Sequence, residues 1–264
     1  SGSPIGMFKY PVSLYQTSNG GATWTLKFAH APGEESVGLP LGGYKYGVAF
    51  RDTLNGWVNG GDYPAEGYFY LFRATDGGLS WSQVQPALPT GYESAYITVG
   101  APKFFGPSQA VLPVWLRTGA GRDLFLYVSS NGGDTWTPSA GFARDVDAVD
   151  ILSMNHAISW GNYDNFFVTS NAGGSWTPLT PNLDFGDGFR ALDFVSPSTG
   201  WLIQAPVNGS TPLYRSLDGG LTWSLLSGSP IQPPTHTPSL TPSPTPTETP
   251  APVFTSPYAV VGIH

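Results

Sequence analysis

The chain has 264 residues and a net charge of −7, and only 11% of its residues are charged, against about 25% in an average soluble domain. The acidic balance excludes nucleic acid as the expected partner, and no apolar run reaches the roughly 18 residues of a membrane span. Cysteine is absent, which excludes disulfides, thiolate metal sites and a cysteine nucleophile. The 34 glycines and 26 prolines predict many short strands joined by tight turns.

The first predicted strands lie at residues 5–10 and 12–17 and lead into the turn sequence SNGGATW at residues 18–24. The turn recurs as TDGGLSW, SNGGDTW, SNAGGSW and LDGGLTW, and each of these box turns has an Asn or Asp anchor, Gly two positions later and Trp five positions later. The anchor oxygen can accept hydrogen bonds from N–H groups ahead of it, glycine permits positive φ, and Trp begins the returning strand. Because Asn serves as well as Asp, we expect the oxygen to matter and the charge not to. The anchor, glycine and tryptophan of each box turn are Asn19, Gly21, Trp24; Asp76, Gly78, Trp81; Asn131, Gly133, Trp136; Asn171, Gly173, Trp176; and Asp218, Gly220, Trp223.

A second pattern precedes the later box turns. VAFRDTLNGW (48–57) matches LDFVSPSTGW (192–201), and segments 102–111 and 149–158 fit the same frame. Each unit is therefore predicted to contain two strands joined by a turn, then a connection, and then two strands joined by a box turn. The anchors at positions 19, 76, 131, 171 and 218 lie 57, 55, 40 and 47 residues apart, which is typical of four-stranded propeller blades. The first unit is too short and is expected to lack its innermost strand.

The box turns resemble the Asp-box, or BNR, repeat, and the GW of the second pattern is most similar to photosystem II assembly-factor-like propellers, with sortilin-type propellers sharing the box. The resemblance covers about residues 5–228. It implies an all-β propeller with about five blades, the first incomplete, in which each box joins the two outer strands of a blade away from the binding face. The same repeat occurs in sialidases and xyloglucanases, so catalysis has to be considered.

A sialidase-like site would need three arginines around a carboxylate, but no arginine here is followed by the Ile-Pro of that family. A xyloglucanase-like site needs two carboxylates across a cleft, one of them a proton donor. The candidates come from two segments, RDVDAVD and LDFGDGFRALD; they are Asp145, Asp147, Asp150, Asp184, Asp187 and Asp193.

Asp150 and Asp193 occupy equivalent positions of the second pattern, where the third unit has Lys103. Since inner strands line a propeller channel, these three charges are expected to face one another there, either as solvated side chains or as a weak cation site. The four histidines, His30, His156, His236 and His264, show no metal-ligand spacing. Neither a metal nor a cofactor is expected.

The segment from 233 to 252 holds eight Pro and six Thr in 20 residues and favours extended polyproline II. Thr and Ser of this linker could carry O-glycans. The chain then ends in YAVVGIH, which has the β-branched character of a strand. The predicted division is a propeller at 1–228, a linker at 229–257 and a strand segment at 258–264. Pairing of Tyr258, Val260, Val261 and Ile263 with the first blade would complete that blade within one chain, or would link chains into an oligomer or filament.

These observations predict a non-catalytic, exported protein, extracellular, at the cell surface or periplasmic, with an interaction or structural role. Its partner would be a protein or a glycan. The alternative is a glycan-active hydrolase of the xyloglucanase or sialidase kind, which would show paired carboxylates in an aromatic-lined cleft.

Overall fold

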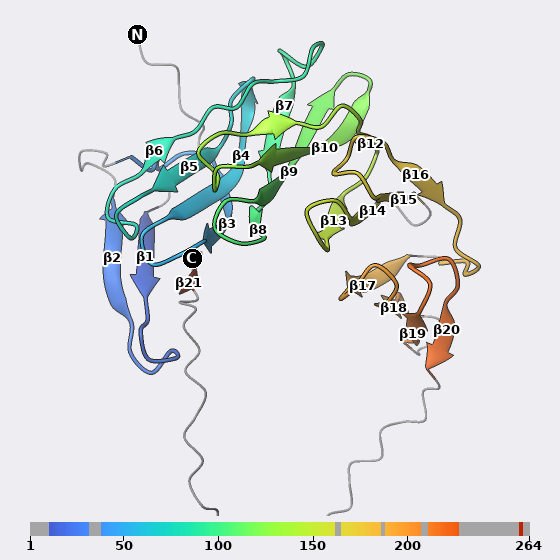
Figure 1. Cartoon of the computed structure of the whole chain (residues 1–264). Coiled ribbons are helices and arrows are strands. Elements are labelled where there is room, and N and C mark those ends of the chain that lie inside the picture. The colour runs from blue at the N-terminus through green and yellow to red at the C-terminus, as the bar shows by residue number, and fades with distance from the viewer. Residues whose placement is uncertain are drawn as a thin grey trace, which may run out of the picture.

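The computed structural model describes residues 11–31, 38–161, 165–185, 188–206, 211–226 and 259–260, with the side chains of 62–66 and 259–260 excepted. Every regular element in these ranges is a β-strand, and all pairings between strands are antiparallel. The strands form five blades that follow one another around an open arc, with blade 1 and blade 5 at its two ends (Figure 1). The predicted all-β propeller fold with about five blades is confirmed.

Blades 4 and 5 are separate four-stranded sheets whose strands pair in chain order. Blade 4 contains β13 (Ala148–Ile151), β14 (Ala157–Trp160), β15 (Phe166–Thr169) and β16 (Thr177–Leu179). Blade 5 contains β17 (Phe189–Phe194), β18 (Gly200–Gln204), β19 (Leu213–Ser216) and β20 (Ser224–Leu226).

Blades 2 and 3 are joined into one sheet, which the repeat pattern did not predict. Blade 2 contains β3 (Tyr44–Phe50), β4 (Gly56–Glu66), β5 (Leu71–Ala74) and β6 (Ser82–Gln83), and blade 3 contains β8 (Lys103–Phe104), β9 (Ala110–Thr118), β10 (Gly121–Ser129) and β11 (Thr137–Pro138). Between them β7 (Tyr96–Val99) pairs with both β4 and β9, while β12 (Ala143–Arg144) pairs with β10. β4 and β9 extend past their blade partners, and β7 satisfies the backbone groups of these extensions. The two longest spacings between anchors, 57 and 55 residues, contain β4 and then β7 and β9.

Each box turn is closed by its own side chains. In the first box Asn19 Oδ1 accepts from the Thr23 N–H at 2.9 Å, and the Gly21 N–H donates to Thr17 Oγ1 at 2.9 Å. Asn and Asp differ only in the bond to the hydroxyl four residues on: Asn171 Nδ2 donates to Ser175 Oγ at 3.0 Å, whereas the Thr222 hydroxyl donates to Asp218 Oδ2 at 2.6 Å. The anchor side chain is the donor of this bond when it is Asn and the acceptor when it is Asp, and the shape of the turn is the same in both cases.

Each box turn of blades 2 to 5 is also bound to the turn between the first two strands of its blade. The N–H of the residue after the anchor donates to a carbonyl of that turn, as from Gly132 to Ser108 at 2.6 Å and from Ala172 to Asn155 at 3.0 Å. The two patterns found in the sequence are therefore in contact within each blade. At this position the backbone is left-handed, with φ +71° at Gly132 and +56° at Ala172.

The hydrophobic core consists of four clusters, one between each pair of neighbouring blades. In each cluster the box tryptophan of one blade packs against the preceding blade. Trp81, Trp136 and Trp223 are 4–5% exposed and Trp176 is half-buried. Trp24 has no described blade packed against it and is 43% exposed, which differs from the burial expected of a box tryptophan.

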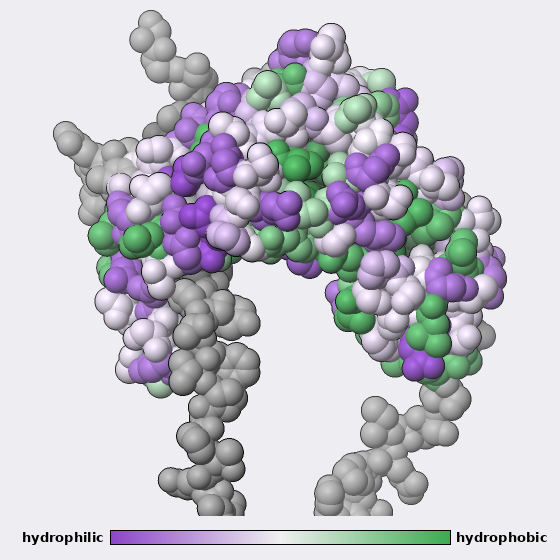
Figure 2. Space-filling view, in the orientation of Figure 1, coloured by the Kyte–Doolittle hydropathy of each residue, from purple (hydrophilic) through white to green (hydrophobic). Residues whose placement is uncertain are grey.

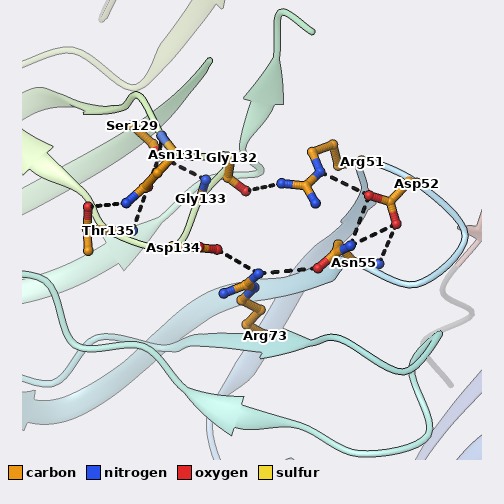
Figure 3. A network of polar contacts seen from close by, with 10 residues as sticks. All are labelled: Arg51, Asp52, Asn55, Arg73, Ser129, Asn131, Gly132, Gly133, Asp134 and Thr135. Atoms are coloured by element: carbon orange, nitrogen blue, oxygen red, sulfur yellow. Dashed lines mark hydrogen bonds and ion pairs between the residues drawn. The ribbon is translucent and has the colours of Figure 1, made fainter. Parts of the chain in front are cut away.

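Polar contacts add to the interface between blades 2 and 3 (Figure 3). Arg51 Nη1 donates to the Gly132 carbonyl at 2.8 Å, and Arg73 Nη2 pairs with Asp134 Oδ1 at 2.7 Å. Asp52 holds Arg51 by an ion pair of 3.0 Å. The box turn of blade 3 is thereby fixed to blade 2 by charged as well as apolar contacts.

Blade 1 contains β1 (Val12–Gln16) and β2 (Thr25–His30), and the two-residue strand β21 (Ala259–Val260) pairs with the free side of β1. The register places Tyr15 opposite Val260 and Gln16 opposite Ala259. β21 therefore lies directly beside β1, where the second strand lies in blades 4 and 5, and not at the position of their innermost strand. Residues 5–10, the linker and the side chains of Tyr258, Val261 and Ile263 lie outside the described residues, so the completion of the blade by 258–263 and the division at 228 and 257 stay predictions.

No helix in the described part of the chain is long and apolar enough to cross a membrane.

Candidate functional site

Three adjoining hollows, of about 190, 460 and 540 Å³, lie on blades 2 and 3 and at the edge of blade 4, and they share Arg117 as a lining residue. Arg117 is near the end of β9, and the β9–β10 ladder runs from Thr118 opposite Gly121 to Ala110 opposite Ser129. Ser129 begins the box turn of blade 3, so the hollows lie at the opposite end of the blades from the box turns. We call this region the groove.

Aromatic side chains form one wall of the groove. Tyr44 and Tyr46 both come from β3, with Tyr46 at a bulge of that strand, and both line the same hollow. Their ring centroids lie 6.3 Å apart with an interplanar angle of 1°, and their residues are 52% and 57% exposed. Tyr96 and Trp115 line the same hollow. The two tyrosines thus present two parallel, accessible aromatic rings.

Charged side chains form the other wall. The Arg122 guanidinium lies 5.3 Å from the centre of the Trp115 ring and pairs with Asp147 Oδ1 at 2.6 Å. The Arg122 N–H donates to Asp145 Oδ1 at 3.2 Å. Asp145 has a φ of +55°, a left-handed conformation that is costly for a residue with a side chain and that clusters at functional sites. Two of the sequence candidates, Asp145 and Asp147, therefore lie at the groove.

An ion pair between the buried Asp123 and the exposed Arg144 supports the hairpin that carries Arg122. Asp123 is 1% exposed, and its carboxylate accepts from Arg144 Nε at 2.9 Å, from Arg144 Nη2 at 3.1 Å and from the Tyr92 hydroxyl at 2.6 Å. Burial and the hydrogen bond to Asp123 raise the pKa of Tyr92 to about 12. Both carboxylate oxygens have partners, as a buried charge requires.

Asp150 and Asp193 come from the inner strands β13 and β17, and Lys103 from β8. Asp150 Oδ2 accepts from the Phe194 N–H at 2.7 Å. Burial, together with the negative charge of Asp193, raises the pKa of Asp150, while Lys103 acts in the opposite direction. These three side chains thus interact electrostatically, and Asp150 is pushed toward its protonated form. Whether they hold a cation stays a prediction.

The other residues that the sequence suggested for a site lie neither at the groove nor with Lys103, Asp150 and Asp193. His30 is buried, with Nδ1 2.7 Å from the Leu39 carbonyl, and burial lowers the pKa of His156 in its turn. Asp184 precedes β17, and Asp187, His236 and His264 lie outside the described residues. Within the described ranges no three His, Cys, Asp or Glu side chains are grouped closely enough to hold a metal ion.

Sequence reasoning did not identify the aromatic and basic residues of the groove, which are Tyr44, Tyr46, Tyr96, Trp115, Arg117 and Arg122. The sequence YKYG contains a usable signal, because two aromatic residues at strand spacing on a polar face have no core to fill. The others read as ordinary strand residues, since only the joining of blades 2 and 3 by β7 brings them together.

Comparison of the sequence with those of known proteins gives one relative, a xyloglucanase. No family model matches the chain. Over 246 residues the chain is 27% identical to a xyloglucanase of Hypocrea jecorina (strain QM6a), which covers 80% of this chain and 28% of that protein. The chain therefore spans little more than a quarter of the length of this relative.

Two solved structures are also similar. A GH74 xyloglucanase from Xanthomonas campestris matches with a TM-score of 0.39 and 23% identity, over 65% of this chain and 28% of that one. YCF48 bound to a D1 peptide matches with a TM-score of 0.34 and 14% identity, over 69% of this chain and 81% of that one. At these TM-scores the fold assignment rests on the strands of the protein itself.

The expectation of a non-catalytic interaction or structural protein is wrong in the light of the xyloglucanase relative, and so is the expectation that the chain is not an enzyme. The alternative, a glycan-active hydrolase, agrees better with that relative. The error has a physical cause: the side chains of the groove come from β3, β7, β9, β10 and the segment after β12, so no contiguous motif marks them.

Proposed function

We propose that this protein acts on a β-glucan as a glycoside hydrolase of the xyloglucanase kind and binds the sugar chain in the groove. The similarity along 80% of the chain to a xyloglucanase carries the proposal. The groove supports it, because it lies at the end of the blades away from the box turns and combines exposed aromatic rings with fixed charged groups. A polymeric substrate does not cross membranes, so the proposal includes export from the cell.

The chemistry of the groove suits a sugar. One face of a pyranose ring carries C–H groups that pack on the electron-rich face of an aromatic ring. The parallel, exposed rings of Tyr44 and Tyr46 offer such faces. Asp145, Asp147 and Arg122 can then accept from and donate to sugar hydroxyls, and the ion pair of Arg122 with Asp147 holds both groups in position before binding.

Hydrolysis needs a carboxyl that is protonated near neutral pH and a second carboxylate that stays ionised. Asp145 and Asp147 are the two carboxylates that line the groove, and both contact Arg122. Asp150 and Asp193 lie one residue from the strand ends that meet the box turns, away from a sugar in the groove. We therefore assign the two carboxylate roles to Asp145 and Asp147.

Calorimetric titration with xyloglucan oligosaccharides tests the binding step. Tyr44→Ala and Tyr46→Ala should each raise Kd about five- to tenfold, since an aromatic contact contributes about 1 kcal/mol beyond its buried area. Tyr15→Ala is the matched control, because Tyr15 is 44% exposed on a strand of blade 1 and should bind as the wild type does. Equal affinity of all four proteins would remove the groove from the proposal.

Release of reducing ends from xyloglucan tests the hydrolytic step. Asp145→Asn and Asp147→Asn should each lower kcat by about 10²–10⁴, as expected for the loss of a general acid or base, with little change in KM. Asp150→Asn is the matched control and should cleave as the wild type does, because Asp150 does not line the groove. A protein that binds the oligosaccharides but never cleaves them would contradict the hydrolase assignment, and cleavage that survives both groove substitutions would remove Asp145 and Asp147 from the catalytic role.

A further inference from the structure

The two groove carboxylates come from one short segment, residues 143–147, which connects blade 3 to blade 4. β12 begins this segment and pairs with β10 of blade 3 through two residues only. At the other end of the segment, the Asp147 N–H donates to the Trp160 carbonyl of β14 in blade 4 at 2.8 Å. Figure 2 shows hydrophilic side chains on the surface around β12, where water competes for backbone hydrogen bonds. A two-residue pairing at the surface is weak by itself, so side-chain contacts are needed to fix its register.

The position of Asp145 depends on that register. The Asp145 N–H donates to the Arg122 carbonyl of β10 at 2.7 Å, and Asp145 Oδ1 accepts from the Arg122 N–H at 3.2 Å. A Cβ added at Gly121 would lie 2.8 Å from the same Oδ1, and one added at Gly161, which follows β14, would overlap the Asp145 carbonyl oxygen. Asp145 is thus in close contact with both blades, and a shift of β12 along β10 would move its carboxylate relative to Asp147.

One buried carboxylate holds β12 in register with β10. Asp123 lies directly opposite Arg144 across the two strands and is 1% exposed. Its Oδ1 and Oδ2 accept from Arg144 Nε and Nη2 at 2.9 and 3.1 Å, which is the two-bond geometry that a guanidinium and a carboxylate favour. The Tyr92 hydroxyl donates to Oδ2 at 2.6 Å, and the Tyr92 ring packs edge-on against Phe125. A slip of β12 by one residue would separate Asp123 from Arg144 and leave a buried charge unpaired.

These side chains lie on the other face of the sheet from the groove. Successive side chains of a strand point to opposite faces, so Asp123 points away from the face of β10 on which Arg122 lines the groove. Tyr92, Asp123 and Arg144 all belong to the described part of the chain, and none of them lines any of the three hollows. They can therefore affect a sugar in the groove only through the segment 143–147.

We propose that Arg144 and Tyr92 are positioning residues for hydrolysis in the groove: through Asp123 they fix β12 against β10, and so they set the positions of the Asp145 and Asp147 carboxylates. The inference rests on the proposed function, because it takes these two carboxylates as the reacting pair. Catalytic groups have to be held close to their productive geometry, and a displacement of about 1 Å can cost about 10²-fold in rate. The ion pair holds them from the face of β10 opposite the groove.

Steady-state kinetics on xyloglucan measure the effect of three substitutions. Arg144→Ala removes both bonds to Asp123, Arg144→Lys replaces the two-pronged guanidinium with a single ammonium, and Tyr92→Phe removes one hydrogen bond and keeps the ring. We expect kcat to fall about ten- to hundredfold in Arg144→Ala and less in the other two, with KM within about twofold of the wild type. Arg73→Ala is the matched control: it removes an ion pair of 2.7 Å to the box turn of blade 3 and should keep the wild-type kcat.

Hydrogen exchange of the Asp145 and Asp147 backbone amides gives a measurement that does not depend on turnover. Both N–H groups donate to carbonyls, one on blade 3 and one on blade 4. Arg144→Ala should speed their exchange about tenfold or more relative to the amides of β9 in the same protein, whereas Arg73→Ala should leave that ratio unchanged. The amides of β9 are the internal reference, because a loss of overall stability would speed exchange throughout the chain.

Wild-type kcat in both Arg144→Ala and Tyr92→Phe would overturn the proposal, and so would a raised KM at unchanged kcat, which would place these side chains in sugar binding. An equal loss of kcat in Arg73→Ala would assign the effect to lowered stability. If Arg144→Ala does not fold, Arg144→Lys and Tyr92→Phe carry the same tests. If the wild type cleaves no glucan, the proposed function fails, and exchange at Asp145 and Asp147 decides the positioning role by itself: a wild-type ratio in Arg144→Ala would exclude it.

Discussion

Ala172 is the residue after the anchor in the box turn of blade 4, and the other four box turns have glycine there, at Gly20, Gly77, Gly132 and Gly219. Its φ is +56°, close to the +66° of Gly20, so the same left-handed backbone is formed by a residue with a Cβ. We expect Ala172→Gly to stabilise the protein. A left-handed conformation costs a residue with a side chain about 1–2 kcal/mol, and the greater freedom of glycine in the unfolded chain returns about 0.4–1 kcal/mol of this. The net gain is about 1 kcal/mol.

Gly20→Ala is the reverse experiment at an equivalent site. No atom lies within 4 Å of a Cβ added at Gly20, so its cost contains the backbone strain alone and should be about 1 kcal/mol of destabilisation. Gly132→Ala should cost more, because its Cβ would lie 2.7 Å from the Pro107 carbonyl oxygen and would meet Arg51.

Urea denaturation followed by tryptophan fluorescence measures the free energy of unfolding of all four proteins. The expected order, from most to least stable, is Ala172→Gly, wild type, Gly20→Ala and Gly132→Ala. A destabilised Ala172→Gly protein would refute the reasoning, because it would show that the alanine methyl contributes more than the strain costs.

Three further predictions concern the box turns, the channel and the chain end. Trp81→Ala should destabilise by about 3–5 kcal/mol, as for a buried aromatic residue, whereas Asp76→Asn should be nearly neutral in the same denaturation assay because an amide can donate to Ser80 as Asn171 does to Ser175; a large effect of Asp76→Asn would show that the charge matters. The raised pKa of Asp150 favours folding with the proton bound, so this contribution is complete below the ordinary pKa of an aspartate and is lost as the pH rises through the raised value. Asp150→Asn should therefore raise the melting temperature at pH 7 and change it little at pH 3, and a gain that is larger at pH 3 would reverse the sign of the argument. Deletion of residues 253–264 should lower the melting temperature if the terminal strand segment stabilises blade 1 within one chain, while an unchanged melting temperature and assembly state would exclude any pairing role.

The sequence by itself determined the repeating unit. Box turns are local: the anchor oxygen, the hydroxyl four residues on and the left-handed glycine all lie within seven residues, so composition at fixed offsets is enough to predict them. The turn between the first two strands of a blade is equally local, and together the two patterns predicted the strands and their antiparallel pairing.

The tertiary structure alone decided where the blades meet and what the groove contains. The insertion of β7 between β4 and β9 depends on backbone groups left unpaired by two strands far apart in sequence, and no local pattern encodes that pairing. Tyr46, Trp115 and Asp147 become neighbours of one groove only through it, so a search for contiguous motifs could not find them. The burial of the box tryptophans was likewise decided by tertiary contacts. Trp24 and Trp81 are equivalent in the repeat, but Trp81 is buried in a cluster with residues of blade 1, whereas no described blade packs against the exposed Trp24.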